Sequence, residues 1–221
     1  MSEMKTLTPL AQTYVDRFDA ARAALPGSGN ERIALIRRDG LDAFAAKDFP
    51  GRKVEEWRFT NLAPLTKGLD GTAEKAANAD LPAPEFATPH VMTFVNGQFA
   101  PAESKLDTLP KGVRLTSLAE ELEEGSAALI EDSDADPRAL VALNTAFMAD
   151  GYVLEAAPGV TLDAPILIRF ISLPGTAEDA RHMRNIIRLG EKSRLTVIEE
   201  HGGTDGHAYF ANPVADIRLA A

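Results

Sequence analysis

The C-terminal part of the chain carries a pattern of alternating apolar and polar residues that repeats at a nearly fixed interval. Ile187 and Ile217 each begin an Ile-Arg-Leu triplet and lie 30 positions apart, and Gly159 and Gly190 lie 31 positions apart. A period of this size is typical of architectures in which similar coils of strands stack on one another. Since one coil cannot bury its own apolar face, each coil needs a neighbour. The pattern therefore predicts that residues 137–221 form the first coils of a right-handed parallel β-helix, incomplete at its C-terminal end.

The residues within each expected strand separate into two faces. In the strand expected around residue 168, one face is wholly apolar and the other is mixed, as in a sheet that is buried on one side only. We expect the mixed face to point outward. The apolar face carries Ile166, Ile168 and Phe170, and the mixed face carries Leu167, Arg169 and Ile171.

Helical periodicity replaces this alternation near the N-terminus. Thr8 and Pro9 are typical of a helix start, in which threonine accepts a backbone hydrogen bond and proline occupies the first helical position. Asn30 can cap a second helix, which Gly40 is expected to interrupt. We therefore assign residues 1–66 to an N-terminal helical domain.

The middle of the chain is less regular. Residues 67–89 are rich in Ala, Asp, Gly and Pro, which predicts a linker or a long surface loop. Asn96-Gly97 lies between apolar runs and suits the tight turn of a β-hairpin, because both residues tolerate positive φ. Ser117 begins a short helix with a capping box. Residues 90–136 are therefore expected to form a hairpin and a short helix segment, and the whole chain is assigned to an α+β, mostly β, fold class.

Composition narrows the classes of function. Of the 221 residues, 45% are hydrophobic and 25% are charged, as in an ordinary soluble globular protein. The net charge of −10 argues against a nucleic-acid-binding surface, which needs clustered Lys and Arg, and against docking on an anionic membrane. The lack of cysteine excludes a disulfide framework, a thiol nucleophile and a thiolate metal site within these residues. Neither a signal peptide nor a membrane-spanning stretch is recognisable, so we expect a cytoplasmic protein.

Three of the four histidines lie close together in the sequence and have acidic neighbours. Their spacing matches no compact metal-binding motif, and side chains beside a glycine-rich loop are usually solvated. A structural or surface role is therefore favoured over a metal site, and the role of the three histidines stays open. The residues that could supply imidazole and carboxylate ligands to a divalent metal ion are His182, His201, His207, Glu199, Glu200 and Asp205.

Other motifs also favour structural roles. Glu55 and Glu56 precede Trp57 and Arg58 and could form an acid–base pair, but adjacent residues of a helix do not share a face. A tryptophan that anchors this helix, with Arg58 paired to an acidic residue, is favoured instead. The chain contains neither a phosphate-binding loop nor a Gly-x-Ser-x-Gly nucleophile turn. No catalytic, cofactor-binding or metal-binding residue is assigned.

Four sequence blocks resemble a known family. Val54–Leu62 resembles its Glu-x-Trp-basic-aromatic-Thr signature, and Phe94–Leu118 contains its Val-Asn-Gly hairpin. Ala142–Ile168 and Arg184–Glu200 resemble the entry into its β-helix. Together the blocks are similar to the N-terminal half of the SufD proteins, which belong to the SufB/SufD family of the bacterial SUF system for iron–sulfur cluster assembly. The last two blocks are shared with SufB, whereas the hairpin block and the short N-terminal helical region favour SufD.

This resemblance implies a function and a set of partners. It implies a non-enzymatic scaffold subunit of a SufBCD complex, with SufB-like and SufC-like subunits as partners and the iron–sulfur cluster only as a product of the whole complex. In the family, the contact with the ATPase SufC and the pairing with SufB lie beyond the part that this chain resembles. We therefore expect a partial chain that binds no cofactor of its own.

Two alternatives remain open. The chain could be a non-catalytic β-solenoid interaction module that self-associates through residues 184–221, because an open sheet edge invites pairing. It could instead be a carbohydrate-active β-helix enzyme that acts on polysaccharides. Such enzymes display aligned carboxylates on an outer sheet, and the expected outward positions of this chain carry none.

Overall fold

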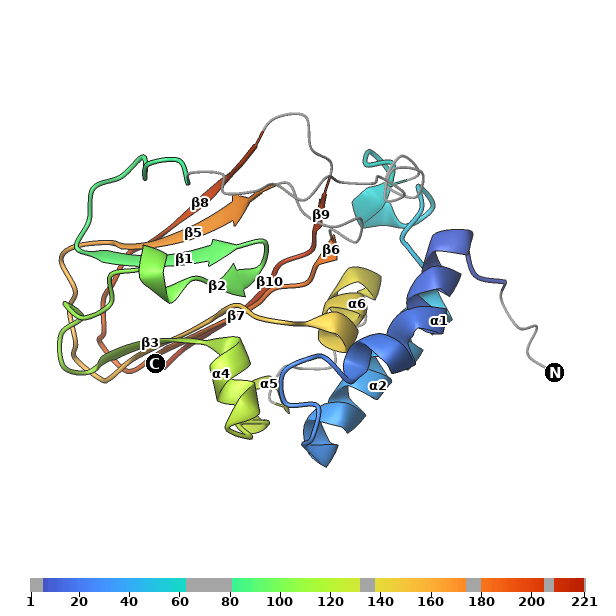
Figure 1. The fold of residues 1–221 in the computed structure, drawn as a ribbon, viewed down its shortest axis with the longest axis horizontal. Coiled ribbons are helices and arrows are strands. Elements are labelled where there is room, and N and C mark those ends of the chain that lie inside the picture. Colours follow the sequence, from blue (N-terminus) through green and yellow to red (C-terminus); the bar gives the residue numbers. More distant parts are fainter. Residues whose placement is uncertain (1–5, 63–80, 132–137, 174–179, 205–208, 221) are drawn as a thin grey trace.

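The computed structural model describes residues 6–62, 81–131, 138–173, 180–204 and 209–220. Two four-stranded sheets face each other, and most of the helices gather at one end of this sandwich (Figure 1). The first described elements of the chain are helices, and the last is a strand, β10.

Parallel strands form the centre of each sheet, and an antiparallel strand borders it. The first sheet has the order β2-β1-β5-β8, in which β2 runs antiparallel to β1. The second sheet has the order β10-β7-β4-β3, in which β3 runs antiparallel to β4. A parallel pair, β6-β9, forms a third, two-stranded sheet. The strands are β1 (His90–Val95), β2 (Gln98–Phe99), β3 (Val113–Ser117), β4 (Tyr152–Ala156), β5 (Ile166–Ser172), β6 (Ala180–Arg181), β7 (Arg184–Leu189), β8 (Val197–Gly203), β9 (Phe210–Ala211) and β10 (Val214–Leu219).

The predicted β-helix is wrong. Both four-stranded sheets mix parallel and antiparallel strands, and the strands of the described residues do not close into a solenoid. The repeat in the sequence has a simpler cause, because Ile187 pairs with Ile217 and Ile166 pairs with Val197 in parallel register. A spacing of 30 or 31 residues therefore reflects parallel pairing between neighbouring strands of the same sheet, β7 with β10 and β5 with β8. Two open sheets, each with one antiparallel border strand, therefore produce the same sequence repeat as a β-helix would.

The helices begin where the sequence predicts. Thr8 caps α1 by accepting a hydrogen bond from Ala11 N, and Asn30 caps α2. The expected interruption of α2 at Gly40 is wrong, because the helix continues through this residue. A Cβ on Gly40 would lie 3.0 Å from Ala142 O, so glycine lets α2 approach α6 closely. The helices are α1 (Pro9–Arg22), α2 (Glu31–Lys47), α4 (Leu118–Glu123), α5 (Ala128–Glu131) and α6 (Ala139–Phe147), with short 3-10 turns η1 (Glu55–Trp57) and η2 (Pro101–Glu103).

The main apolar core lies between the two sheets. Phe94 of β1 and Phe170 of β5 stack with their ring centroids 5.3 Å apart, in the same cluster as Leu154 of β4. Burying one such side chain contributes about 1.5–3 kcal/mol, so this layer is a large part of the stability of the sandwich. A second cluster joins α2 and α4 to the other face of the second sheet and includes Ile33, Leu118, Leu122, Val153 and Ile186.

Strand β5 is buried on both faces. Its mixed face points away from the core between the sheets, as predicted, but it is covered and not exposed to solvent. Arg169 on that face donates from Nη2 to Pro82 O at 2.5 Å and pairs through Nε with Glu200 Oε1 at 3.0 Å. Glu85 N donates to the other carboxylate oxygen of Glu200 at 3.0 Å. Pro82 and Glu85, in the described part (residues 81–89) of the predicted linker, therefore contact the outer face of β5 and β8. Residues 67–80 of that linker fall outside the described ranges.

Buried polar side chains join the helices to the strands. Arg37 of α2 donates from Nη1 to Met148 O at 2.6 Å, and burial lowers the pKa of its guanidinium to about 10. Asn144 of α6 donates from Nδ2 to Met183 O at 2.8 Å and to Asn212 O at 2.7 Å. Because each carbonyl is a fixed acceptor, these bonds hold α2 and α6 in one position on the strands.

Two predicted turns and caps are confirmed in the middle of the chain. Asn96 and Gly97 join β1 to β2 with φ angles of 51° and 77°, which are the positive values that a tight hairpin turn requires. Ser117 Oγ accepts a hydrogen bond from Glu120 N at 3.3 Å and so starts α4. The turn and the cap each depend on residues that are close together in the chain, so both can be predicted from the sequence alone.

Asp150 is a buried carboxylate at the meeting point of several elements. Its Oδ2 accepts a hydrogen bond from Phe99 N of β2 at 2.8 Å. Its Oδ1 accepts from Ser117 Oγ at 2.8 Å, and also from Ala119 N at 3.1 Å and Gly151 N at 2.8 Å. One side chain thus holds β2, the start of α4 and the approach to β4 together.

Replacing Asp150 by alanine is expected to lower the free energy of unfolding by about 3–5 kcal/mol, because four donors lose a shared buried acceptor. Asp150→Asn is expected to lower the free energy of unfolding by less. Its amide oxygen can still accept hydrogen bonds, and only the Phe99 N–H loses its acceptor, because it would face the amide nitrogen, which is also a donor. Urea unfolding followed by circular dichroism measures both values. The control is Asp163→Asn, an exposed carboxylate in the loop before β5, which should change stability by less than about 0.5 kcal/mol. Equal costs at both positions would contradict the role of Asp150.

Candidate functional site

The structure separates the residues that the sequence grouped as possible metal ligands. His182 lies between β6 and β7 and is buried, whereas the side chain of His201 on β8 is 50% exposed. Glu200 points to the outer face of its sheet, where it pairs with Arg169. His207 and Asp205 lie outside the described residues. Among the residues that the structure describes, no three or more His, Cys, Asp or Glu side chains gather closely enough to hold a metal ion.

His182 is a core residue. Its ring centroid lies 5.8 Å from those of Tyr14 and Phe210, both edge-on, and 5.7 Å from that of Phe147. Its Nδ1 lies 3.2 Å from Asn212 Nδ2, and because an amide nitrogen only donates, Nδ1 is the unprotonated acceptor of a neutral ring. Burial lowers the pKa of His182 to about 3. The side chain therefore contributes packing and one hydrogen bond.

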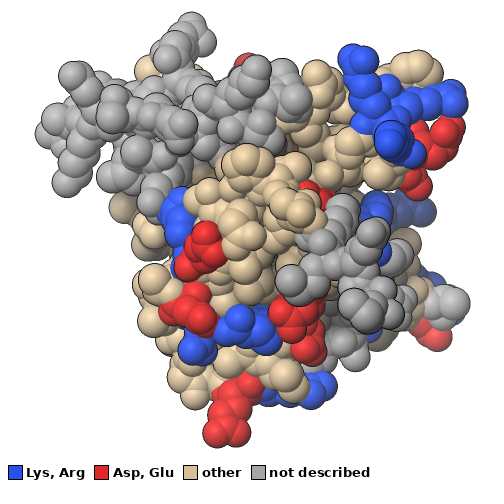
Figure 2. Space-filling model, turned by 90° about the vertical axis from the view of Figure 1, so that its right-hand side faces the viewer, with Lys and Arg blue, Asp and Glu red and all other residues tan. Residues whose placement is uncertain are grey.

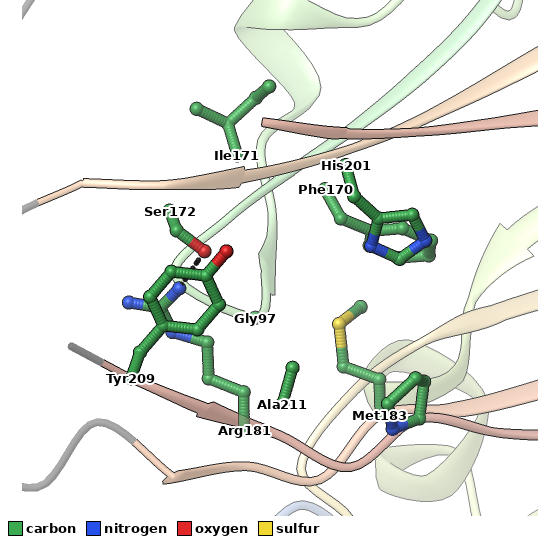
Figure 3. Close-up of a pocket in the computed structure, with 10 residues that line it drawn as sticks. Gly97, Phe170, Ile171, Ser172, Arg181, Met183, His201, Tyr209 and Ala211 are labelled. Carbon is green, nitrogen blue, oxygen red and sulfur yellow. Dashed lines mark hydrogen bonds between the residues drawn. The ribbon is translucent and has the colours of Figure 1, made fainter. Parts of the chain in front are cut away.

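A cavity of about 70 Å³ lies near the ends of β5 and β8, beside the β6-β9 pair (Figure 3). The rings of Phe170 and His201 line one side, with centroids 4.9 Å apart. Arg181 lines another side, where it donates to Ser172 Oγ and holds its guanidinium 4.8 Å from the Tyr209 ring centroid. The walls thus combine aromatic rings with one cationic group.

Glu199 faces the interior of the sandwich beside this cavity. Its register partner on β5 is Ile168, which belongs to the core between the sheets. Tyr152 of β4 donates from its hydroxyl to Glu199 Oε1 at 3.0 Å, so the bond crosses from one sheet to the other. Burial raises the pKa of Tyr152, and the Glu199 carboxylate raises it further, so the phenol keeps its proton. Glu199 Oε2 lies 3.4 Å from His201 Nε2.

The segment around the single tryptophan is more exposed than predicted. Glu55–Trp57 forms one 3-10 turn, η1, in which no residue is fully buried. The expected ion pair of Arg58 is confirmed, since its Nη1 lies 2.7 Å from Glu55 Oε1. Arg58 also lies 4.5 Å from the ring centroid of Phe59, which is exposed. Trp57 is half-buried and therefore does not anchor a helix in the core.

Strand β10 presents apolar side chains at the edge of the second sheet. It pairs with β7, and its residues Ile217 and Leu219 are 60% and 68% exposed. Their register partners Ile187 and Leu189 face the core between the sheets. An edge strand of this kind can pair with another chain, so β10 has the properties of a protein-contact surface.

The helical end of the molecule carries both signs of charge. Lys and Arg residues alternate there with Asp and Glu residues (Figure 2). Asp19 of α1 pairs with Arg38 of α2 at 2.6 Å and with Arg22 at 3.1 Å, and the hydrogen bond from Arg38 is the main cause that lowers the pKa of Asp19. Within the described ranges, no helix has both the length and the apolar character that crossing a membrane requires.

Sequence reasoning missed most of the residues that surround the cavity. Arg181 and Tyr209 belong to no short motif, and they meet because β6 pairs with β9. Tyr152 reaches Glu199 only because the two sheets face each other. One signal was available: Glu199 and His201 are two positions apart on a strand, so their side chains must share a face.

Comparisons with known proteins match most of the chain. Residues 8–168 match the family described as the SufBD protein N-terminal region. The chain is also 26% identical over 227 residues to an iron–sulfur cluster assembly SufBD family protein from Synechocystis. That match covers 94% of this chain and 50% of the relative, so the chain spans about half the length of the curated relative. Neither match distinguishes SufD from SufB.

The buried neutral His182 is expected to make stability depend on pH. Its pKa is about 3 in the folded state and about 6.5 in an unfolded chain, so between these values only the unfolded state binds the proton. The contribution of His182 is therefore complete above pH 6.5 and falls by up to about 1.4 kcal/mol per unit below it. Urea unfolding at a series of pH values measures this slope.

The matched variants for this experiment are His182→Phe and His201→Ala. Phenylalanine keeps the ring contacts, so His182→Phe should cost about 1 kcal/mol above pH 7, where Asn212 loses its acceptor, and should flatten the slope below pH 6.5. His201→Ala removes an exposed ring and should retain the slope. A slope that is identical in all three proteins would contradict the assignment to His182.

Proposed function

We propose that this chain, which belongs to the SufBD family, is the N-terminal part of a SufD-like scaffold subunit that acts in iron–sulfur cluster assembly within a SufBCD complex. The observation that carries the proposal is the family match over residues 8–168, which spans the elements from α1 to β4. In this proposal the subunit holds SufB-like and SufC-like partners in the cytoplasm, and the cluster is a product of the assembled complex.

The way in which the resembling blocks meet in the fold supports this proposal. Phe99 and Ser117 belong to the block Phe94–Leu118, and both donate hydrogen bonds to Asp150 in the block Ala142–Ile168. The hairpin that favours SufD over SufB is therefore joined directly to a block that the two subunits share. In a SufD-like chain these hydrogen bonds would hold β2 of the hairpin in its place at the border of the first sheet.

A scaffold also needs helices that stay in place when partners bind. The buried bonds of Arg37 and Asn144 to strand and loop carbonyls meet this need, because they fix α2 and α6 to the sandwich. The polysaccharide-enzyme alternative depended on a β-helix, which the structure contradicts.

Co-purification tests the scaffold role. A tagged protein of the relative's length that contains this chain is expressed with SufB-like and SufC-like subunits, and it should retain both. The 221-residue chain alone should fail to retain SufC, because we place that contact beyond the N-terminal region. Stable retention of SufC by the chain alone would contradict this placement. Loss of both partners by the longer protein would contradict the scaffold role itself.

The exposed edge of β10 favours a second function, in which the chain is an interaction module that self-associates through residues 184–221. The supporting observation is the exposure of Ile217 and Leu219 on a strand that ends its sheet. Their register partners on β7 are core residues, so a further strand beside β10 would extend the same apolar face.

Light scattering over a wide concentration range tests self-association. The average mass of the chain should rise with concentration, and Ile217→Lys should suppress the rise, because a charge at the edge opposes pairing. Leu35→Lys is the matched control, since Leu35 is an exposed apolar residue of α2, and it should behave as the unmodified chain does. A constant monomer mass, or equal suppression by both variants, would exclude association through β10.

A further inference from the structure

Two side chains of types that can bind metal ions lie next to each other on the inner face of β8. Glu199 and His201 are separated by one residue, and their register partners Ile168 and Phe170 both face the core. Their side chains are 36% and 50% exposed, so an ion can reach them from solvent. This pair contains one imidazole and one carboxylate, which are ligands that zinc accepts.

The distance between the two donor atoms suits a shared ion. Glu199 Oε2 and His201 Nε2 lie 3.4 Å apart, which is long for a hydrogen bond between them. Two donors at that separation, each about 2.1 Å from one ion, subtend an angle of about 108° at it. That angle is close to tetrahedral, the geometry that zinc prefers. The pair is thus spaced for binding an ion without a change in the strand.

Neighbouring side chains hold both donors in orientation. The Tyr152 hydroxyl donates to Glu199 Oε1 at 3.0 Å, which leaves Oε2 turned toward the histidine. The His201 ring lies against Phe170 with an interplanar angle of 32° and lines the cavity. Hydrogen bonds to a ligating carboxylate of this kind typically strengthen metal binding, because they fix the ligand before the ion arrives.

We propose that Glu199 and His201 bind a divalent transition-metal ion of the zinc class, with water in the remaining coordination positions and Tyr152 as a positioning residue. Water completes the site because the described residues near the pair supply no third His, Cys, Asp or Glu ligand. Mg²⁺ is a poor fit, since it prefers an all-oxygen octahedral site. The proposal is independent of the SufD-like role, because it depends only on contacts within β4, β5 and β8.

Calorimetric titration of the tag-free 221-residue chain with ZnCl₂ tests the site. We expect saturable binding that His201→Ala and Glu199→Gln each weaken at least tenfold, because each removes one of two protein ligands. Tyr152→Phe keeps the core packing and should weaken binding about tenfold through loss of the orienting hydrogen bond. Glu191→Gln, at an exposed position in the turn after β7, should leave the affinity unchanged, and MgCl₂ should give no saturable binding.

The histidine ring itself gives a second readout. Zinc should shift the ring resonances of His201 in a nuclear magnetic resonance spectrum and leave those of the buried His182 in place. Unfolding curves of the three variants show whether each remains folded at the titration temperature, so a lost fold is separated from a lost ligand. Absence of saturable zinc binding by the unmodified chain, or equal affinity in His201→Ala, would overturn the proposal.

Discussion

The fold depends on one buried carboxylate that neutral donors satisfy. Asp150 accepts hydrogen bonds from β2, from the residue that ends β3 and starts α4, and from the amides that follow in α4 and before β4. A charge is tolerated inside a protein only when such bonds replace the water that it loses. Since β2 and β3 are the antiparallel borders of the two sheets, the same side chain helps to hold both border strands in place.

Amide side chains perform a similar task between the helices and the strands. Asn144 donates to two carbonyls, one before β7 and one before β10, while Asn212 donates back to Leu140 O of α6 at 2.8 Å and to His182. Apolar contacts alone would allow α6 to shift along the sheet edge. The hydrogen bonds between Asn144, Asn212 and their partners are directional, so they can all form only when α6 is in one position. The neutral state of His182 belongs to that arrangement, because a protonated ring could not accept from Asn212.

Local signals predicted the elements better than their assembly. The caps at Thr8 and Asn30 depend on adjacent residues, and the structure confirms them. The sequence period located strands that pair in parallel, but β2 and β3 come from outside the repeat, so it could not show the antiparallel borders. Alternation along β5 could not reveal that Pro82 and Glu85, from far earlier in the chain, contact the outer face of β5 and β8. Likewise, alternation places Glu199 and His201 on one face, whereas the contact with Tyr152 requires the second sheet.

The contact between Glu85 and Glu200 has a consequence for the synthesis of the protein. The two residues are 115 positions apart, and a ribosome that adds about 5–20 residues per second needs roughly 6–23 s to pass from one to the other. During that interval the emerging chain has made β1 and the segment that will cover β5, but β8 does not yet exist. Apolar faces of the unfinished sheet are then open to other nascent chains. We expect such a protein to rely on chaperones at the ribosome more than one whose contacts are local.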